Sequence, residues 1–220
     1  EMCIRDSYSG AASATITGSR ILDADAASGA ITFNGTALTR TAGTDTLTLK
    51  GQAADTLTLG SVGAAGAELA TVTVNTGIAA FTGDVFADAQ DYSGAASATV
   101  TGTVTLDADN AAGAVNFTGT NLTGSGATLN VDVDASSTVT FAQVGAAGTE
   151  LANVDVDTGI VAFTGDVFAN AQDYSGAASA TITGTITLDG DAGAGAVNFS
   201  GTDITGSGTT LSIVCLLYTS

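Results

Sequence analysis

Internal repetition is the feature that most constrains what this chain can fold into. Residues 81–106 read FTGDVFADAQDYSGAASATVTGTVTL and residues 163–188 read FTGDVFANAQDYSGAASATITGTITL, so Tyr174 is the counterpart of Tyr92. An earlier copy of the same words begins at Tyr8, and it is slightly longer because of two extra residues between 36 and 46. We therefore divide the chain into copies at 8–91, 92–173 and 174–214, the last of them partial. Such repetition is typical of arrays in which each unit packs against its neighbours.

The two ends of the chain are expected to lie outside the repeat. Residues 1–6 (EMCIRD) and 215–220 (CLLYTS) resemble the two reading directions of a transposon mosaic end, used as a sequencing adapter. We interpret 1–7 and 215–220 as translated adapter sequence and 8–214 as a continuous internal fragment of a longer protein. Both cysteines, Cys3 and Cys215, then fall outside the repeat, which leaves it without disulfide or thiol chemistry.

Acidic residues dominate the charge of the repeat. Without the adapter-derived residues, 20 acidic side chains face three basic ones, and no Lys or Arg follows Lys50. Nucleic acid is therefore excluded as a partner, because binding its phosphates requires a basic surface. No apolar run reaches the length of a membrane helix, so no membrane insertion is expected in this segment. Screening by salt or divalent cations favours an extracellular, saline setting, although the aspartates can also simply keep a Gly- and Ala-rich surface soluble.

The composition predicts many short strands. Gly, Ala, Thr, Ser, Asp and Val dominate, and Pro and Trp are absent, a composition that suits neither helices nor disorder. The helix-like words AGAELA at 65–70 and AGTELA at 147–152 are each too short for more than a turn. β-Branched residues alternate with polar ones, bounded by Gly, Asn, Asp and Ser, in segments that include 14–16, 70–74, 130–133, 138–141 and 180–188.

A shorter repeat lies inside the long one. Its anchors are apolar residues, mostly Phe, at successive spacings of 26, 22, 36, 24, 22 and 36. The longest step has room for an additional strand pair around the word AQDYSGA at 89–95 and 171–177. A mean coil of about 20 to 27 residues is typical of parallel solenoids, in which equivalent apolar residues stack into ladders. The anchors are Phe33, Leu59, Phe81, Phe117, Phe141, Phe163 and Phe199.

We therefore expect an all-β fold, a parallel β-helix or β-solenoid. The absence of proline fits this fold, because interior strands donate backbone hydrogen bonds to their neighbours. Val100 and Val104 of one copy become Ile182 and Ile186 in the next, exchanges that keep a ladder apolar. The alternative is a row of immunoglobulin-like β-sandwiches of about 82 residues each. A sandwich, however, has no reason to repeat one word three times per domain.

Several words of the repeat resemble those of a known family. GAVNFTGTNLTG at 113–124, GAVNFSGTDITG at 195–206, TGIVAFTGDVF at 158–168 and AQDYSGA at 171–177 are similar to the words of giant bacterial β-strand-repeat surface adhesins. These adhesins are akin to filamentous haemagglutinins and autotransporter passengers. The resemblance covers essentially all of 8–213. It implies a right-handed parallel β-helix, export to the cell surface or medium, and a role in attachment.

Paired aspartates are the main candidates for a binding site. Alternate carboxylates can share a hard cation such as calcium, but neither the calcium-loop pattern with its closing Glu nor the Gly-Gly-x-Gly-x-Asp nonapeptide is present. The simpler interpretation is that these aspartates solvate and cap turns. We therefore predict no metal or cofactor site, and calcium stays an alternative. The D-x-D pairs are Asp23/Asp25, Asp107/Asp109 and Asp189/Asp191 in one series, and Asp132/Asp134 and Asp155/Asp157 in a second.

Catalysis is not expected. The sequence has no His and, between the adapter-derived ends, no Cys, so a Ser or Cys triad cannot be built within it. Glycoside cleavage by paired carboxylates needs one asymmetric cleft, whereas these aspartates recur with the repeat. The Gly-rich words at 123–127 and 205–209 lack the Lys of a phosphate-binding loop and are expected to be turns.

The sequence thus predicts a structural and adhesive stalk of a secreted bacterial cell-surface protein, not an enzyme. Its expected partner is a host or environmental surface, with glycans among the candidates. Self-association through exposed end strands is a further expectation. The alternative is a calcium-stabilised repeat array that binds glycans or surfaces.

Overall fold

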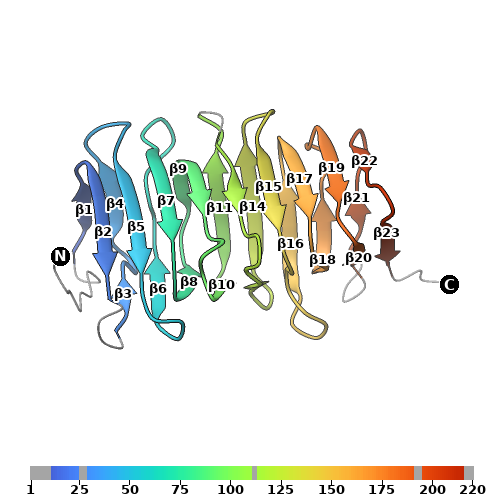
Figure 1. Ribbon diagram of the computed structural model, residues 1–220, viewed down its shortest axis with the longest axis horizontal. Helices are drawn as coiled ribbons and strands as arrows, with labels where there is room; N and C mark the ends of the chain where they lie inside the picture. The colour runs from blue at the N-terminus through green and yellow to red at the C-terminus, as the bar shows by residue number, and fades with distance from the viewer. Residues whose placement is uncertain (1–10, 25–28, 111–112, 191–194, 216–220) are drawn as a thin grey trace.

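The chain forms a parallel β-solenoid of about eight turns. The structure, a computed structural model, describes residues 11–24, 29–110, 113–190 and 195–215, and these residues form 23 strands and no helix. The strands lie side by side along the long axis, with the N-terminus at one end and the C-terminus at the other (Figure 1). Every strand pairing in the described residues is parallel. The expected solenoid is therefore confirmed, and the alternative of antiparallel sandwiches is wrong.

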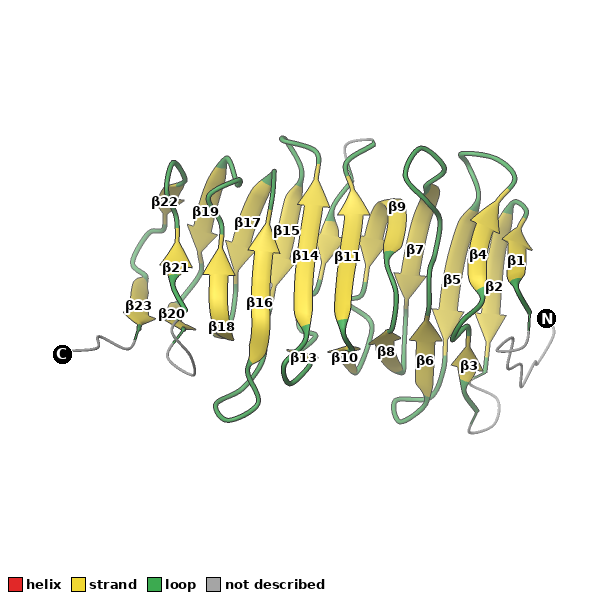
Figure 2. Cartoon of the chain, turned by 180° about the vertical axis from the view of Figure 1, so that it is seen from behind, coloured by secondary structure: helices red, strands yellow, loops and turns green. Residues whose placement is uncertain are grey.

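Each turn contributes one strand position to each of three stacks, which we name face one, face two and face three. Figure 2 shows the stack from behind, with loops joining successive strands at the edges. Face one holds β1 (Ser13–Ile16), β4 (Ala37–Arg40), the bridge residue Val62, the start of β9 (Val85–Asp91), β11 (Thr103–Ala108), β14 (Thr128–Val133), β16 (Leu151–Val156), the end of β18 (Val167–Asp173) and β21 (Val197–Asn198).

The other two faces are built in the same way. Face two holds β2 (Ser19–Asp23), β5 (Thr46–Lys50), β7 (Leu69–Val74), the end of β9, β12 (Val115–Asn116), β15 (Thr138–Phe141), β17 (Ile160–Phe163), β19 (Ser179–Ile182) and β22 (Asp203–Thr205). Face three holds β3 (Ile31–Thr32), β6 (Thr56–Leu59), β8 (Ile78–Phe81), β10 (Ser97–Val100), β13 (Leu122–Thr123), the bridge residue Val144, the start of β18, β20 (Thr185–Asp189) and β23 (Thr210–Val214).

The strands form where apolar and polar residues alternate. In β14, with the sequence TLNVDV, every second side chain is buried, because successive residues of a strand point to opposite sides of the sheet. The helix-like word at 65–70 is a turn that leads into β7, with the amide of Ala67 bonded to the carbonyl of Ala64. The segment 180–188 divides into β19 and β20, and Gly184 between them takes a φ of 86°, which favours glycine.

The coil length agrees with the sequence expectation. On face three, successive partners are Ile31, Leu57, Ala79, Ala98 and Leu122. One turn therefore takes roughly 19 to 26 residues there, a length typical of parallel solenoids. Backbone groups at the corners are also paired from turn to turn, for example the amide of Ile78 with the carbonyl of Asp55. Backbone pairing thus continues from turn to turn through the described residues.

An aromatic column runs through the core. The ring of Tyr92 lies between two phenylalanine rings, with its centroid 4.9 Å from that of Phe81 and 5.0 Å from that of Phe117. In the next copy, Tyr174 lies between Phe163 and Phe199 in the same way. Phe117 and Phe141 follow each other directly at 6.4 Å. Burying each ring stabilises the fold by about 1.5–3 kcal/mol. The predicted anchors are therefore core residues, all buried except Phe199, which is partly buried.

The longest steps between anchors contain the expected additional strand pair. From Phe117 to Phe141 the chain passes three strand positions, which is one turn. From Phe81 to Phe117 it passes five, because β9 bends at a corner and pairs with β7 and β12 on face two as well as with β11 on face one. The anchors thus move from face three at Phe81 to face two at Phe117, a shift that the spacing alone did not reveal.

Candidate functional site

The structure distributes the first series of aspartate pairs over all three faces. Asp23, Asp107 and Asp189 are equivalent in sequence but lie on faces two, one and three. They form no common row. Asp25 and Asp191 lie outside the described residues.

The second series stacks on face one. Asp107 is the register partner of Asp132, and Asp157 follows in the next turn, where its amide bonds to the carbonyl of Val131. A parallel row runs beside them, since each of its residues is the partner of the next: Asn130, Asp155, Asp173 and Asn198. We call these two rows, Asp107/Asp132/Asp157 and Asn130/Asp155/Asp173/Asn198, the acidic ladder. They bring together side chains from β11, β14, β16, β18 and β21.

The charges of the acidic ladder perturb one another. Burial, together with the neighbouring charges of Asp109 and Asp132, raises the pKa of Asp107 to about 6. Burial also raises the pKa of Asp155, and the charges of Asp157 and Asp173 add to this effect. Neighbouring strands of a sheet lie about 4.8 Å apart, so carboxylates stacked in register repel each other.

Asp173 behaves in the opposite way. The amide and hydroxyl of Ser175 lower its pKa by hydrogen bonding, and Asn198 adds to this. The distance from the Ser175 amide to Asp173 Oδ1 is 3.0 Å, and the distance from Asn198 Nδ2 to the same oxygen is also 3.0 Å. Asp173 is therefore held as an oriented carboxylate.

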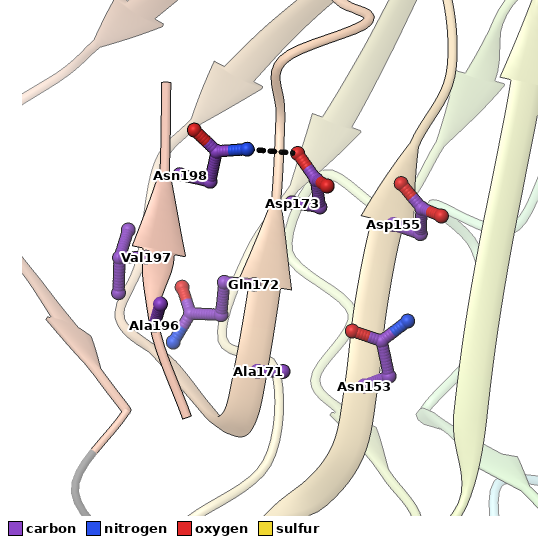
Figure 3. A pocket seen from close by; sticks show the side chains of 8 residues that line it. All are labelled: Asn153, Asp155, Ala171, Gln172, Asp173, Ala196, Val197 and Asn198. Atoms are coloured by element: carbon purple, nitrogen blue, oxygen red, sulfur yellow. Dashed lines mark hydrogen bonds between the residues drawn. The ribbon is translucent and has the colours of Figure 1, made fainter. Parts of the chain in front are cut away.

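A shallow groove lies across the end of the acidic ladder. Its volume is about 430 Å³. Figure 3 shows Asn153, Asp155, Asp173 and Asn198 along β16, β18 and β21, and the small Ala171 on β18 between its neighbours. Carboxylates and amides offer hydrogen bonds to hydroxyl or cationic groups. The groove thus combines these polar groups with the small apolar side chains of Ala171, Ala196 and Val197.

Turn capping accounts for two of the predicted aspartates. Asp107 Oδ1 accepts the amide of Asp109 at 3.3 Å, and Asp134 Oδ1 accepts the amide of Ser136 at 2.9 Å. These contacts confirm the capping interpretation for Asp107 and Asp134. Within the described ranges, no group of three or more His, Cys, Asp or Glu side chains is placed to hold a metal ion.

The Asp–Asn pairs are the feature that sequence reasoning missed. Asn198 Nδ2 donates to Asp173, and Asn116 Nδ2 donates to Asp91 over 3.1 Å in the preceding copy. Both pairs join the words AQD and VNF, and the paired residues are separated by 25 positions, about one coil length. That spacing was the signal available in the sequence.

The fold defines the chain as a β-solenoid repeat protein. The chain matches no protein-family model, no curated protein and no solved structure. No described segment forms a helix that is long and apolar enough to cross a membrane.

Proposed function

We propose that this solenoid is the structural and adhesive shaft of a secreted bacterial cell-surface protein. The observation that carries the proposal is the unbroken stack of about eight turns, whose core holds an aromatic column from Phe81 to Phe199. Such a stack resists bending because each turn is bonded to the next along three faces. The resemblance of the repeat words to those of surface adhesins supports the same class.

An extracellular location and a passive role are part of the proposal. The net charge of −18 suits a saline medium that screens it. The acidic ladder and its groove supply polar contacts, so the proposed partners are host or environmental surfaces, including glycans, and not nucleic acid. The proposal includes no catalysis, because the chain carries carboxylates without His or a reactive thiol in the repeat. The exposed Ile204 and Ile213 near one end support association between chains as a further proposal.

The shaft proposal is tested by measuring the end-to-end distance of the chain. Dyes attached at the two ends of the full chain are compared by single-molecule energy transfer with dyes on a Gly/Ser linker of equal residue number. Eight turns at about 4.8 Å give a narrow distance distribution centred at ~38 Å. The linker has a broad distribution centred at ~80 Å. A distribution for the chain as broad as that of the linker contradicts a stiff shaft.

Adhesion is tested separately. Cells that carry the chain on a surface anchor, and cells that carry the linker, are washed under flow in saline over glass coated with cellulose, chitin or alginate. Greater retention of the cells with the chain on at least one coating supports adhesion, and equal retention on all three rejects it. Length and adhesion can thus fail independently.

The second candidate is a calcium-stabilised array that binds glycans. The favouring observation is the stacking of carboxylates in the acidic ladder, where burial chiefly raises the pKa values of Asp107 and Asp155 and repulsion from neighbouring carboxylates adds to the effect. A cation between the rows would relieve that repulsion. Isothermal titration of the chain with calcium, with magnesium as the matched control, decides this: heat specific to calcium supports the candidate, and no heat removes it.

A further inference from the structure

The three copies of one word lie on three different faces. The word YSGAASAT(I/V)TG begins at 8, 92 and 174. Its strands are β1 on face one, β10 on face three and β19 on face two. The same side chains are thus presented in different directions.

A set of threonine pairs marks this rotation. Each copy stacks an outward Thr on a Thr of the following turn, with their hydroxyl oxygens 3.2 to 3.4 Å apart. The pairs are exposed, and one lies on each face: Thr15 with Thr39 on face one, Thr99 with Thr123 on face three, and Thr181 with Thr205 on face two.

The cause is the number of strand positions in one copy. From β1 to β10 the numbering advances by nine strands, the bridge residue Val62 adds one position, and β9 adds another because it serves two faces. From β10 to β19, Val144 and the bent β18 do the same. Eleven positions are not divisible by three, so each copy begins one face away from the last. The first copy is slightly longer than the second but gives the same shift. Its two extra residues fall in the loop between β4 and β5 and therefore add no strand position.

We infer that the repeat is built to rotate its surface by one face per copy, so that the solenoid presents the same side chains in three directions. The inference deepens the proposed shaft function and rests on it for its biological meaning, but the geometry can be tested without any ligand. A partner that recognises the repeated word meets it at three positions around this one chain. A flat partner that lies along one face meets the word once in this chain.

The same rotation opposes side-by-side pairing of two solenoids. A flat face with one unbroken row of hydroxyl groups could pair with an identical face of a second solenoid along its whole length. Here each face changes its outward residues from copy to copy: on face two, Thr48 and Thr73 are followed by Asp91 and Asn116. An in-register lateral contact is therefore limited to a few turns.

Engineered disulfides test the bent strand that causes the shift. In a chain with Cys3 and Cys215 replaced by Ser, Phe86→Cys with Asp107→Cys reports the pairing on face one, and Thr71→Cys with Ala89→Cys reports the pairing on face two. Both disulfides are expected to form together under mild oxidation, because register partners in adjacent strands lie within disulfide reach. Asp107→Cys with Ala89→Cys is the matched control and is expected not to form. Failure of one of the two reporting pairs in a chain that keeps its β circular dichroism overturns the inference.

Spin labels at outward-facing, half-buried threonines supply a second test that leaves the bent strand intact. Labels at Thr48 and Thr181 lie on one face six turns apart, and their distance calibrates the axial rise at about 29 Å. Labels at Thr99 and Thr181 are separated by less than four turns, about 18 Å along the axis. The inference predicts a Thr99–Thr181 distance clearly longer than that axial value, because the labels point from different faces. A distance equal to the axial value contradicts it.

Discussion

The hydroxyl of Tyr92 donates a hydrogen bond of 3.0 Å to Gln90 Oε1 inside the solenoid core, where both side chains are buried. Gln90 occupies the position that Val72 and Val115 hold in the adjacent turns. Its amide nitrogen donates to the carbonyls of Val85 and Asp107, at 3.0 and 2.8 Å. The pair therefore satisfies backbone groups at the corner where β9 bends, and burial raises the pKa of Tyr92 far above its ordinary value.

Removing the hydroxyl of this pair is expected to destabilise the fold. Tyr92→Phe keeps the ring in the aromatic column but leaves Gln90 Oε1 buried without a donor, at a cost of about 1–3 kcal/mol. Denaturant unfolding followed by circular dichroism measures the change. Tyr174→Phe is the matched variant, because Tyr174 donates to Gln172 over 3.2 Å in the next copy. Equal stability of the wild type and both variants would contradict a structural role for the network.

Truncating the aromatic column is expected to cost more. Phe141→Ala removes a fully buried ring that lies between Phe117 and Phe163, and such changes typically cost about 3–5 kcal/mol. Phe141→Leu keeps most of the buried volume and is expected to cost less. The same unfolding assay ranks the variants, and a smaller effect for Ala than for Leu would argue against the column.

Gly113 is expected to tolerate no side chain. A Cβ at this position would overlap the carbonyl oxygen of Asp88 in the preceding turn, and Gly195 meets Asn170 in the same way. Gly113→Ala must therefore push two turns apart, with a loss of at least about 1–3 kcal/mol. Gly190→Ala is the control, because its Cβ would come no closer than 3.5 Å to Val197. Thermal melting of both variants should separate them clearly, and matching midpoints would show that the turns are less tightly packed than described.

Acidification is expected to stabilise the solenoid over a limited range. The pKa of Asp107 rises from the ordinary 3.8 to about 6 on folding, so the folded chain binds this proton more tightly. The resulting stability is fully present below pH 3.8 and is lost as the pH rises through 6. The free energy of unfolding should thus increase as the medium is taken from neutral to mildly acidic pH, and Asp107→Asn should weaken that dependence. An unchanged or steeper rise in the variant would contradict this assignment.

Asp45 sets the lower limit of that range. Backbone hydrogen bonds from Ala42 and Gly18, helped by Thr41, hold its pKa at about 2. Because the pKa of Asp45 is lower in the folded chain, its ionised carboxylate stabilises the fold above pH 3.8, and this contribution is lost as the pH falls toward 2. Stability is therefore expected to decline again in strong acid. In Asp45→Asn this decline should be smaller, which pH-dependent melting can measure.

Much of the fold was readable from the sequence, because solenoid cores repeat their apolar residues. The alternation of β14 and the spacing of Phe117, Phe141 and Phe163 predicted strands and a stacked core directly. The face of each residue could not be predicted, because it depends on β9 and β18 bending at a corner. That bend relies on buried partners such as Gln90, whose role appears only when the turns are stacked. For the same reason, the sequence did not reveal that the equivalent residues Asp23 and Asp107 lie on different faces.

The central claim is that the stacked core holds this solenoid together without a cation. Circular dichroism with thermal melting of the full chain, in chelator and again in millimolar calcium, tests it most directly, with sodium at equal ionic strength as the control. The account predicts ordered β-structure in chelator and the same melting midpoint in calcium as in the matched sodium buffer. A chain that is unfolded in chelator and folds with calcium, but not with sodium, would contradict it.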